Sequence, residues 1–128
     1  MSSRINIASD TPWEDIVGYS RAVRVGNLIE VAGTTAVEGP DIIADGNAYM
    51  QAAFIFTKIE KALRNAGGSM SDVIRTRMYV TGSHVIDDVL KAHAEVFRNI
   101  RPAATIVVVS ALVDNRLLVE IEVTAVVE

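Results

Sequence analysis

Two glutamates stand in a segment that is otherwise largely apolar, and they are the first candidates for chemistry. Glu120 and Glu122 interrupt the aliphatic stretch 117–127. Placing a carboxylate among apolar side chains costs free energy unless the charge is paired or hydrogen-bonded. Each glutamate therefore either pairs with Arg75 or Arg77 of another strand, or has a raised pKa and activates water as a general base.

The two histidines have different surroundings in the sequence. His93 falls on the apolar stripe of a predicted helix, together with Val85, Val89 and Val96. Such a histidine is either a packed, hydrogen-bonded side chain or a proton carrier that lines a cleft. His84 lies at the start of the same helix and is predicted to be exposed.

Several kinds of site are missing from the sequence. The chain has no cysteine, which excludes disulfides, thiolate zinc sites and a cysteine nucleophile. It has no Gly-rich phosphate loop and no nucleophile elbow, and His84 and His93 lack the spacing of metal ligands. The sequence therefore predicts no metal site.

The charge balance and the hydrophobic runs bear on partners and location. Twelve Lys and Arg against 16 Asp and Glu give a formal net charge of −4, which disfavours non-specific nucleic-acid binding because such binding depends on neutralising phosphates. No stretch approaches the roughly 18 uninterrupted apolar residues of a membrane span. The first residues lack the apolar core of a secretory signal. We expect no nucleic-acid partner, no membrane contact and a cytoplasmic location.

The elements that position these residues form one predicted domain over 1–128. Hydrophobic periods of two and of three to four residues distinguish strands from helices along the chain. They predict, in order, a hairpin over 18–37 that turns at Gly26-Asn27, a helix over 46–66, a strand over 72–81, a helix over 84–99, and strands over 104–110 and 117–127. Gly67-Gly68 is interpreted as the stop of the first helix.

This order, β-β-α-β-α-β-β, indicates an α+β fold with one sheet and two helices packed on one of its faces. The opposite face needs a cover of another kind, because residues 105–109 are apolar on both sides of their strand. With glycine counted and tyrosine left out, about 54% of the residues are apolar, above the roughly 45–50% of an average domain. We infer that the second face is partly buried in an oligomer.

Several segments, in order and over nearly the whole chain, resemble the Rid family of reactive intermediate deaminases, also called the YjgF or endoribonuclease L-PSP family. The Arg-Pro-Ala and Val-Glu-Ile-Glu segments carry most of the specificity. The matching segments are 18–27 (GYSRAVRVGN), 31–34 (VAGT), 62–67 (ALRNAG), 80–81 (VT), 101–103 (RPA) and 119–126 (VEIEVTAV).

The resemblance implies a chorismate-mutase-like fold and a homotrimer with small-molecule clefts between subunits. It also implies hydrolysis, without a cofactor, of 2-imino or 2-enamino acids to 2-oxo acids and ammonia. Some relatives are described as endoribonucleases or translation inhibitors, a role that the acidic charge disfavours here. A cytoplasmic trimer acting on a small molecule is the favoured interpretation, and a non-catalytic ligand-binding or protein-interaction trimer is the alternative.

The family's site residues carry over only in part. Tyr19 matches a tyrosine of the cleft, Gly33 matches the glycine of the second strand, and Glu120 matches the glutamate that positions water. The arginine that binds the substrate carboxylate is missing, because the family's Pro-Ala-Arg-Ser is here Pro-Ala-Ala-Thr, with Ala104 at the arginine position. Three alternatives follow from the missing arginine. Arg101 reaches the same cleft, or the ligand has no carboxylate and is held by His93 and Glu120, or the protein binds a ligand without catalysis.

Overall fold

The computed structural model describes residues 3–9 and 11–128 and contains one six-stranded sheet. The strands of this sheet are β1 (Arg4–Ile7), β2 (Ala22–Val25), β3 (Leu28–Thr34), β6 (Val73–Val80), β7 (Ala103–Val108) and β8 (Val119–Val126). A short separate hairpin contains β4 (Val37–Glu38) and β5 (Asp41–Ile42). The helices are α1 (Trp13–Val17), α2 (Ala48–Asn65) and α3 (Ile86–Phe97), with single 3₁₀ turns at Met70–Asp72 and Ser83–Val85.

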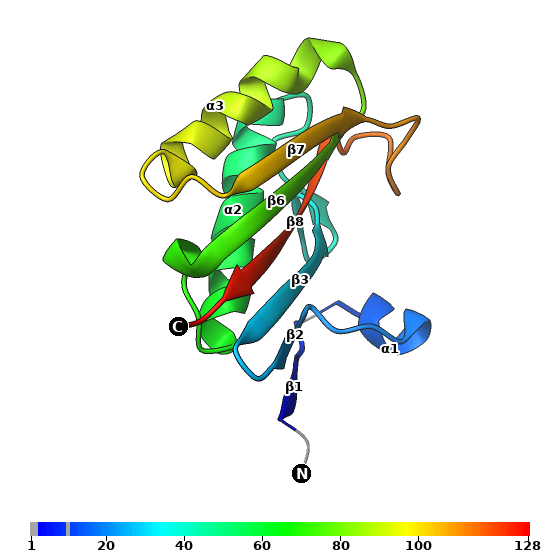
Figure 1. The fold of residues 1–128 in the computed structure, drawn as a ribbon. Coiled ribbons are helices and arrows are strands. Elements are labelled where there is room, and N and C mark those ends of the chain that lie inside the picture. Colours follow the sequence, from blue (N-terminus) through cyan, green and yellow to red (C-terminus); the bar gives the residue numbers. More distant parts are fainter. Residues whose placement is uncertain (1–2, 10) are drawn as a thin grey trace.

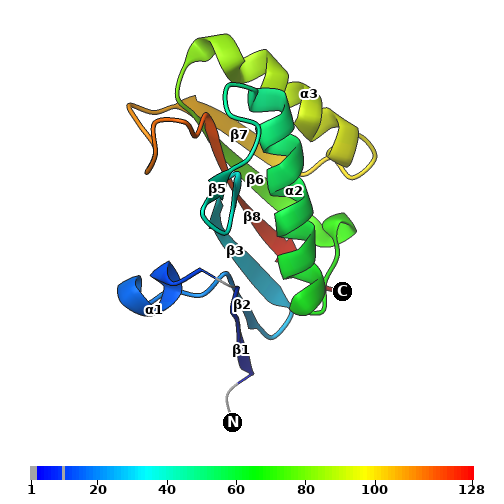
Figure 2. The same ribbon diagram turned by 180° about the vertical axis from the view of Figure 1, so that it is seen from behind.

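The strand order is β1-β2-β3-β8-β6-β7, and every pairing is antiparallel except that of β6 with β7. That parallel pair is connected through α3, as a parallel crossover requires. Both α2 and α3 lie on one face of the sheet (Figures 1 and 2). The predicted α+β, chorismate-mutase-like fold is confirmed. The four short elements β1, α1, β4 and β5 were not predicted.

Alternation along the central strand builds the core between the sheet and the helices. Val119, Ile121, Val123 and Ala125 of β8 are buried, while the residues between them are only partly buried. On the helix side the rings of Phe56 and Phe97 meet edge to face, with centroids 5.5 Å apart. The strand that carries Glu120 is thus fixed by its buried side.

Helix α2 has identifiable signals at both ends. The side chain of Asn47 accepts a hydrogen bond from the Met50 amide, which caps the first turn. At the other end Gly67 has a φ of +86°, and Arg24 of β2 donates to the Ala66 carbonyl at 2.8 Å. The predicted stop at Gly67-Gly68 is therefore confirmed.

A buried glutamine ties α2 to the chain that leads into β8. Gln51 is fully buried, and its amide nitrogen donates to the carbonyls of Ala44 and Arg116, at 3.3 and 3.0 Å. Its side-chain oxygen accepts from the Leu118 amide at 2.9 Å. These three bonds fix the backbone two residues before Glu120.

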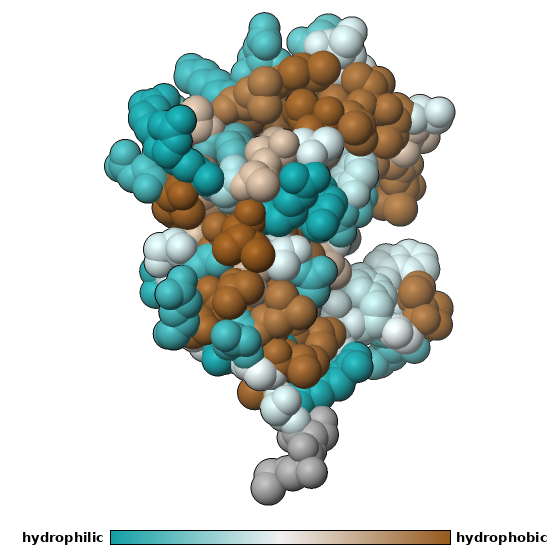
Figure 3. All heavy atoms as spheres, viewed as in Figure 1, coloured by the Kyte–Doolittle hydropathy of each residue, from teal (hydrophilic) through white to brown (hydrophobic). Residues whose placement is uncertain are grey.

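The face of the sheet opposite the helices is uncovered in a single chain. Figure 3 shows hydrophobic residues gathered there in patches, with hydrophilic side chains between them. Val107 and Val108 of the edge strand β7 are 42% and 51% exposed, so the expected burial of 105–109 on both sides is not provided by this chain alone. Val25 and Leu28, at the β2–β3 turn, are also exposed.

Strand β6 departs from the predicted alternation at one residue. Simple alternation along β6 would put Ile74 on the same side as Thr76, Met78 and Val80, which are buried, but Ile74 is 51% exposed. The pairing of β6 with β8 shifts register between Val73 and Arg75. Because such a bulge inserts an extra residue into the ladder, it turns Ile74 outward.

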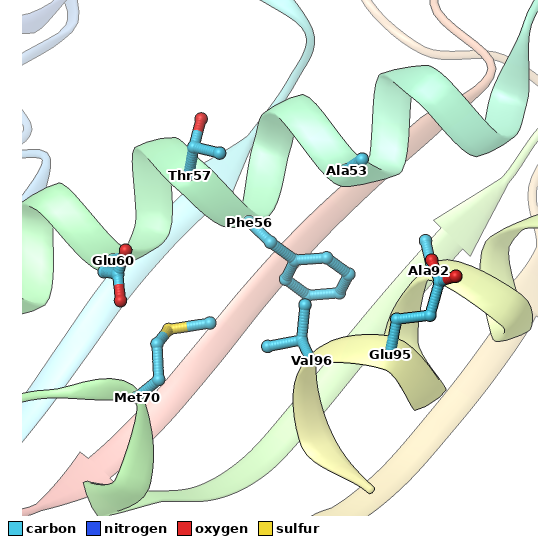
Figure 4. A pocket seen from close by; sticks show the side chains of 8 residues that line it. All are labelled: Ala53, Phe56, Thr57, Glu60, Met70, Ala92, Glu95 and Val96. Atoms are coloured by element: carbon cyan, nitrogen blue, oxygen red, sulfur yellow. The ribbon is translucent and has the colours of Figure 1, made fainter.

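No helix in the described part of the chain is both long enough and apolar enough to cross a membrane. A hollow of about 200 Å³ lies between α2 and α3, where Phe56 and Val96 point toward one another (Figure 4). It contains none of the predicted site residues.

Candidate functional site

The carboxylate of Glu120 lies directly over the backbone of Gly33. A Cβ atom added to Gly33 would stand 2.0 Å from Oε2 of Glu120, so only glycine leaves room for the carboxylate there. Gly33 lies near the end of β3, and Glu120 near the start of β8, on the face that the helices leave open. In Figures 1 and 3 these strand ends lie beside the indentation between α1 and the β7–β8 connection.

Glu120 is partly buried, and it makes no hydrogen bond to another described residue. Burial raises the pKa of its carboxyl group, the guanidinium of Arg21 lowers that pKa, and the nearby Glu122 raises it again. The net effect is a raised pKa. A carboxylate of this kind can hold a water molecule and take its proton.

Arg21 and Tyr19 lie close to Gly33 and Glu120, and we call these four residues the Glu120 cluster. Sequence reasoning missed Arg21 as a site residue. Its Nη2 donates to the Gly33 carbonyl at 2.7 Å, and its guanidinium carbon lies 5.8 Å from the centre of the Tyr19 ring. The available signal was a basic residue two positions after Tyr19 and directly before the apolar pair Ala22-Val23. Nothing in the sequence places that residue near Glu120, because their proximity depends on the order of the strands.

Tyr19 reaches the cluster because α1 ends two residues earlier, at Val17. Gly18 has a φ of +88° and its amide bonds to the Glu14 carbonyl, so the helix stops there. The buried Glu14 carboxylate also accepts hydrogen bonds from the Ser9 amide, at 3.1 Å to each oxygen. Tyr19 is 37% exposed.

The proposed pairing of Glu120 and Glu122 with Arg75 and Arg77 is wrong within one chain. The described ion pairs join other residues, Arg64 with Glu60 and Arg116 with Asp114. Glu122 instead accepts a hydrogen bond from the hydroxyl group of Tyr79, while Arg75 donates to Thr105 at 2.6 Å. Arg77 lies opposite Glu122 in the ladder but donates to Thr124, at 3.5 Å. Tyr79 therefore takes the role expected of an arginine.

His93 lies on the other side of the sheet from Glu120. Its Nε2 is 2.9 Å from the hydroxyl oxygen of the fully buried Thr76, and its ring is 4.8 Å from that of Phe97. Burial lowers the pKa of His93. This geometry matches the packed, hydrogen-bonded alternative. His84 is exposed, as expected.

Ala104 and Arg101 do not join the Glu120 cluster of their own chain. Ala104 is paired with Thr76 and shares its helix-facing side, whereas Glu120 is paired with Tyr79 and lies on the open face. Arg101 is exposed, and its backbone has a φ of +61°, in the left-handed region at the end of α3. One chain thus assembles Tyr19, Gly33 and Glu120 but not Arg101, His93 or Ala104. Among residues 3–9 and 11–128, no three acidic or histidine side chains are arranged to hold a metal ion.

Comparison with known proteins agrees with this fold. The sequence model of the family described as Endoribonuclease L-PSP matches residues 10–127. The solved structure of Rv2704 from Mycobacterium tuberculosis, described as a member of the highly conserved YjgF/YER057c/UK114 family, superimposes with a TM-score of 0.87 at 45% identity, over 98% of this chain and all of the other.

Two curated relatives extend the comparison. The uncharacterized protein SCO2049 of Streptomyces coelicolor is 39% identical over 93% of this chain and 89% of its own length. A 2-iminobutanoate/2-iminopropanoate deaminase of the mite Dermatophagoides farinae is 30% identical over the whole of both chains. The protein belongs to the Endoribonuclease L-PSP family, which is also the YjgF or Rid family.

Proposed function

We propose that this protein is a cofactor-independent hydrolase that deaminates a small reactive imine or enamine at the Glu120 cluster. The observation that carries the proposal is the Glu120 carboxylate, which is half-buried over Gly33, makes no hydrogen bond to a described residue and has a raised pKa. The relative named as a 2-iminobutanoate/2-iminopropanoate deaminase supports the choice of substrate class.

In the proposed reaction Glu120 takes a proton from water while the oxygen adds to the imine carbon. The nitrogen then accepts that proton back from Glu120 and a second proton from the new hydroxyl group. It leaves as ammonia while a C=O bond replaces the C=N bond, and Glu120 returns to its ionised form. Water is the only co-reactant. Arg21 supplies the positive charge beside Glu120, and we propose that it attracts the carboxylate of the substrate in place of the arginine that is absent at position 104.

We further propose that the cluster works in a homotrimer. The open face of the sheet carries exposed apolar side chains on β7 and at the β2–β3 turn, which one chain leaves uncovered. A second copy of the chain would cover such a surface and narrow the opening above Glu120.

The test couples the protein to a dehydratase that generates 2-iminopropionate and measures the release of the 2-oxo acid. The wild-type protein is expected to accelerate release, and Glu120→Gln to lower that acceleration about 100-fold or more, the lower end of the usual contribution of a general base. The ionised carboxylate is the active form. Activity is therefore expected to rise with pH as Glu120 loses its proton, and the midpoint of that rise should lie above 4.5, the ordinary pKa of a glutamate.

Glu122→Gln is the matched control, because Glu122 lies on the same strand and is hydrogen-bonded to Tyr79. It should keep most of the activity. Equal losses in both variants would remove the role given to Glu120. A wild-type protein that leaves the rate unchanged would overturn the hydrolase proposal and favour the alternative, a ligand-binding or protein-interaction trimer, which the missing cation at Ala104 also favours.

A further inference from the structure

A second hollow, of about 280 Å³, lies between α2 and the chain around β1 and β2. It is separate from the hollow of Figure 4, and Figure 2 shows α2 lying over this side of the sheet. Its lining includes three of the chain's basic side chains and one amide. The lining residues are Ile7, Ala8, Ser9, Arg21, Lys58, Lys61, Ala62 and Asn65.

The basic residues of this hollow converge because of their positions in the sequence. Lys58, Lys61 and Asn65 recur at three- and four-residue spacing along α2 and so share one face of the helix. Arg21, the residue just before β2, enters the hollow from the side of the sheet. None of the described lining residues is acidic, so together they carry a formal charge of +3.

Three carboxylates act on residues of this lining from outside it. Glu38 acts on Lys58 and Glu120 acts on Arg21, in each case through its charge. Glu14 is hydrogen-bonded to Ser9. No described ion pair joins these carboxylates to Arg21, Lys58 or Lys61, so the described residues compensate the positive charge of the hollow only partly.

Two groups in the hollow are held in costly positions. Lys58 is drawn inward by hydrogen bonds to the carbonyls of Val37 and Thr35, at 2.9 and 3.2 Å, and burial together with the charge of Arg21 lowers its pKa. The Nε atom of Arg21 is buried and has no hydrogen-bond partner among residues 3–9 and 11–128. A buried donor without a described partner and two neighbouring cations both favour the binding of a negatively charged group that accepts hydrogen bonds.

We propose that this hollow binds a small dianion, a phosphate or a dicarboxylate group, between Arg21, Lys58 and Lys61. Two negative charges offset most of the three positive ones, and the Asn65 amide offers one further donor. The apolar side chains of Ile7 and Ala62 leave room for a short hydrocarbon part of the same ligand. The site lies apart from the proposed reaction at Glu120, although Arg21 borders both.

The test titrates the full-length protein with inorganic phosphate and, separately, with malonate, and follows the backbone amide signals of Ser9, Ala62 and Asn65 by NMR. Sodium chloride at matched ionic strength is the reference. We expect saturable shifts with either dianion or with both. Lys61→Gln removes one charge from an exposed helix position, so it should weaken binding about threefold or more, as expected for the loss of a partly exposed ion pair.

Lys91→Gln is the matched control, because Lys91 is an exposed lysine on α3, outside the hollow. It should titrate like the wild type. Shifts no larger than those in sodium chloride would overturn the proposal. Equal affinities of the wild type and Lys61→Gln for the dianion would overturn it as well.

Discussion

At the level of single residues, the position of Glu120 depends on what Gly33 lacks. The carboxylate occupies the space where any other residue at position 33 would place its Cβ atom. The same carboxylate is near Arg21, which is itself held by the Gly33 carbonyl. Gly33 therefore contributes both the space above its Cα atom and the acceptor that orients the neighbouring cation.

Gly33→Ala should destabilise the protein by about 1 kcal/mol, the lower end of the cost of overpacking, because the displaced group is the end of a flexible side chain. The cost should disappear in a Glu120→Ala background, where the new methyl group finds open space. Urea unfolding of the wild type, both single variants and the double variant measures this coupling. An equal cost in both backgrounds would show that Gly33 does not act through Glu120.

His93 makes the stability depend on pH with a definite sign. Burial lowers its pKa below the ordinary 6.5, so the unfolded chain binds the proton at a higher pH than the folded chain does. The stability that the neutral ring contributes is therefore present above 6.5, and it is lost as the pH falls through 6.5 toward the lowered value.

His93→Gln should flatten the dependence of the unfolding free energy on pH over roughly pH 5–7.5. The measurement is urea unfolding at a series of pH values. His84→Gln is the control, since His84 is exposed, and it should keep the wild-type slope. Identical slopes for both variants would rule out His93 as the source.

At the level of elements, Gln51 connects α2 to the chain before β8 more tightly than any apolar contact could. Gln51→Leu should lower the unfolding free energy by about 1–3 kcal/mol, because the Leu118 amide and two carbonyls lose a buried partner. Met50→Leu, at an exposed neighbouring position, should stay within about 0.5 kcal/mol. Thermal or urea unfolding that fails to separate the two variants would contradict this role of Gln51.

The elements that sequence reasoning located are those with a strong hydrophobic period. The hairpin with its Gly26-Asn27 turn, α2, β6, α3, β7 and β8 all occur within a few residues of their predicted bounds. By contrast, β1 and α1 are short and largely exposed, so their stability comes from neighbours rather than from a local pattern. The bulge that turns Ile74 outward depends on the pairing with β8, which alternation within β6 alone does not reveal.

The site was predictable only as far as residue type and family resemblance reach. Glu120, Gly33 and Tyr19 were found in that way, and the structure brings them together. Arg21 was missed, because its place near Glu120 depends on which side of the sheet a residue faces in the assembled order. Within one chain Ala104 faces the other side of the sheet from Glu120. The partner of Glu122 proved to be Tyr79, since a diagonal contact across the ladder was available to its hydroxyl group.

At the level of the whole molecule, the two faces of the sheet differ in kind. One is closed by α2 and α3, while the other carries Glu120 among polar groups and exposed apolar side chains. Arg21 contributes to the Glu120 cluster and to the hollow between α2 and the chain around β1 and β2. The proposed trimer would bury the open face and leave this hollow beside α2 accessible to a ligand.

Light scattering should give a mass near three times the 13.8 kDa of one chain. Val107→Lys places a charge on the exposed edge strand β7 and should shift the mass toward that of one chain, because burying an unpaired charge is costly. Leu90→Lys, on the exposed side of α3, is the control and should leave the mass unchanged. A stable wild-type monomer would contradict the trimer.

The position of β8 between β3 and β6 has a consequence for how the chain folds. Strands β6 and β7 are joined through α3 within one continuous stretch, whereas the β3–β8 pair joins segments about 90 residues apart, which closes a long loop and is expected to be slow. Pulse-labelling hydrogen exchange should therefore show amides of α3 and β6 protected before those of β3. Since Gly33 and Glu120 come from the late pair, the proposed reaction site would be the last part of the chain to form.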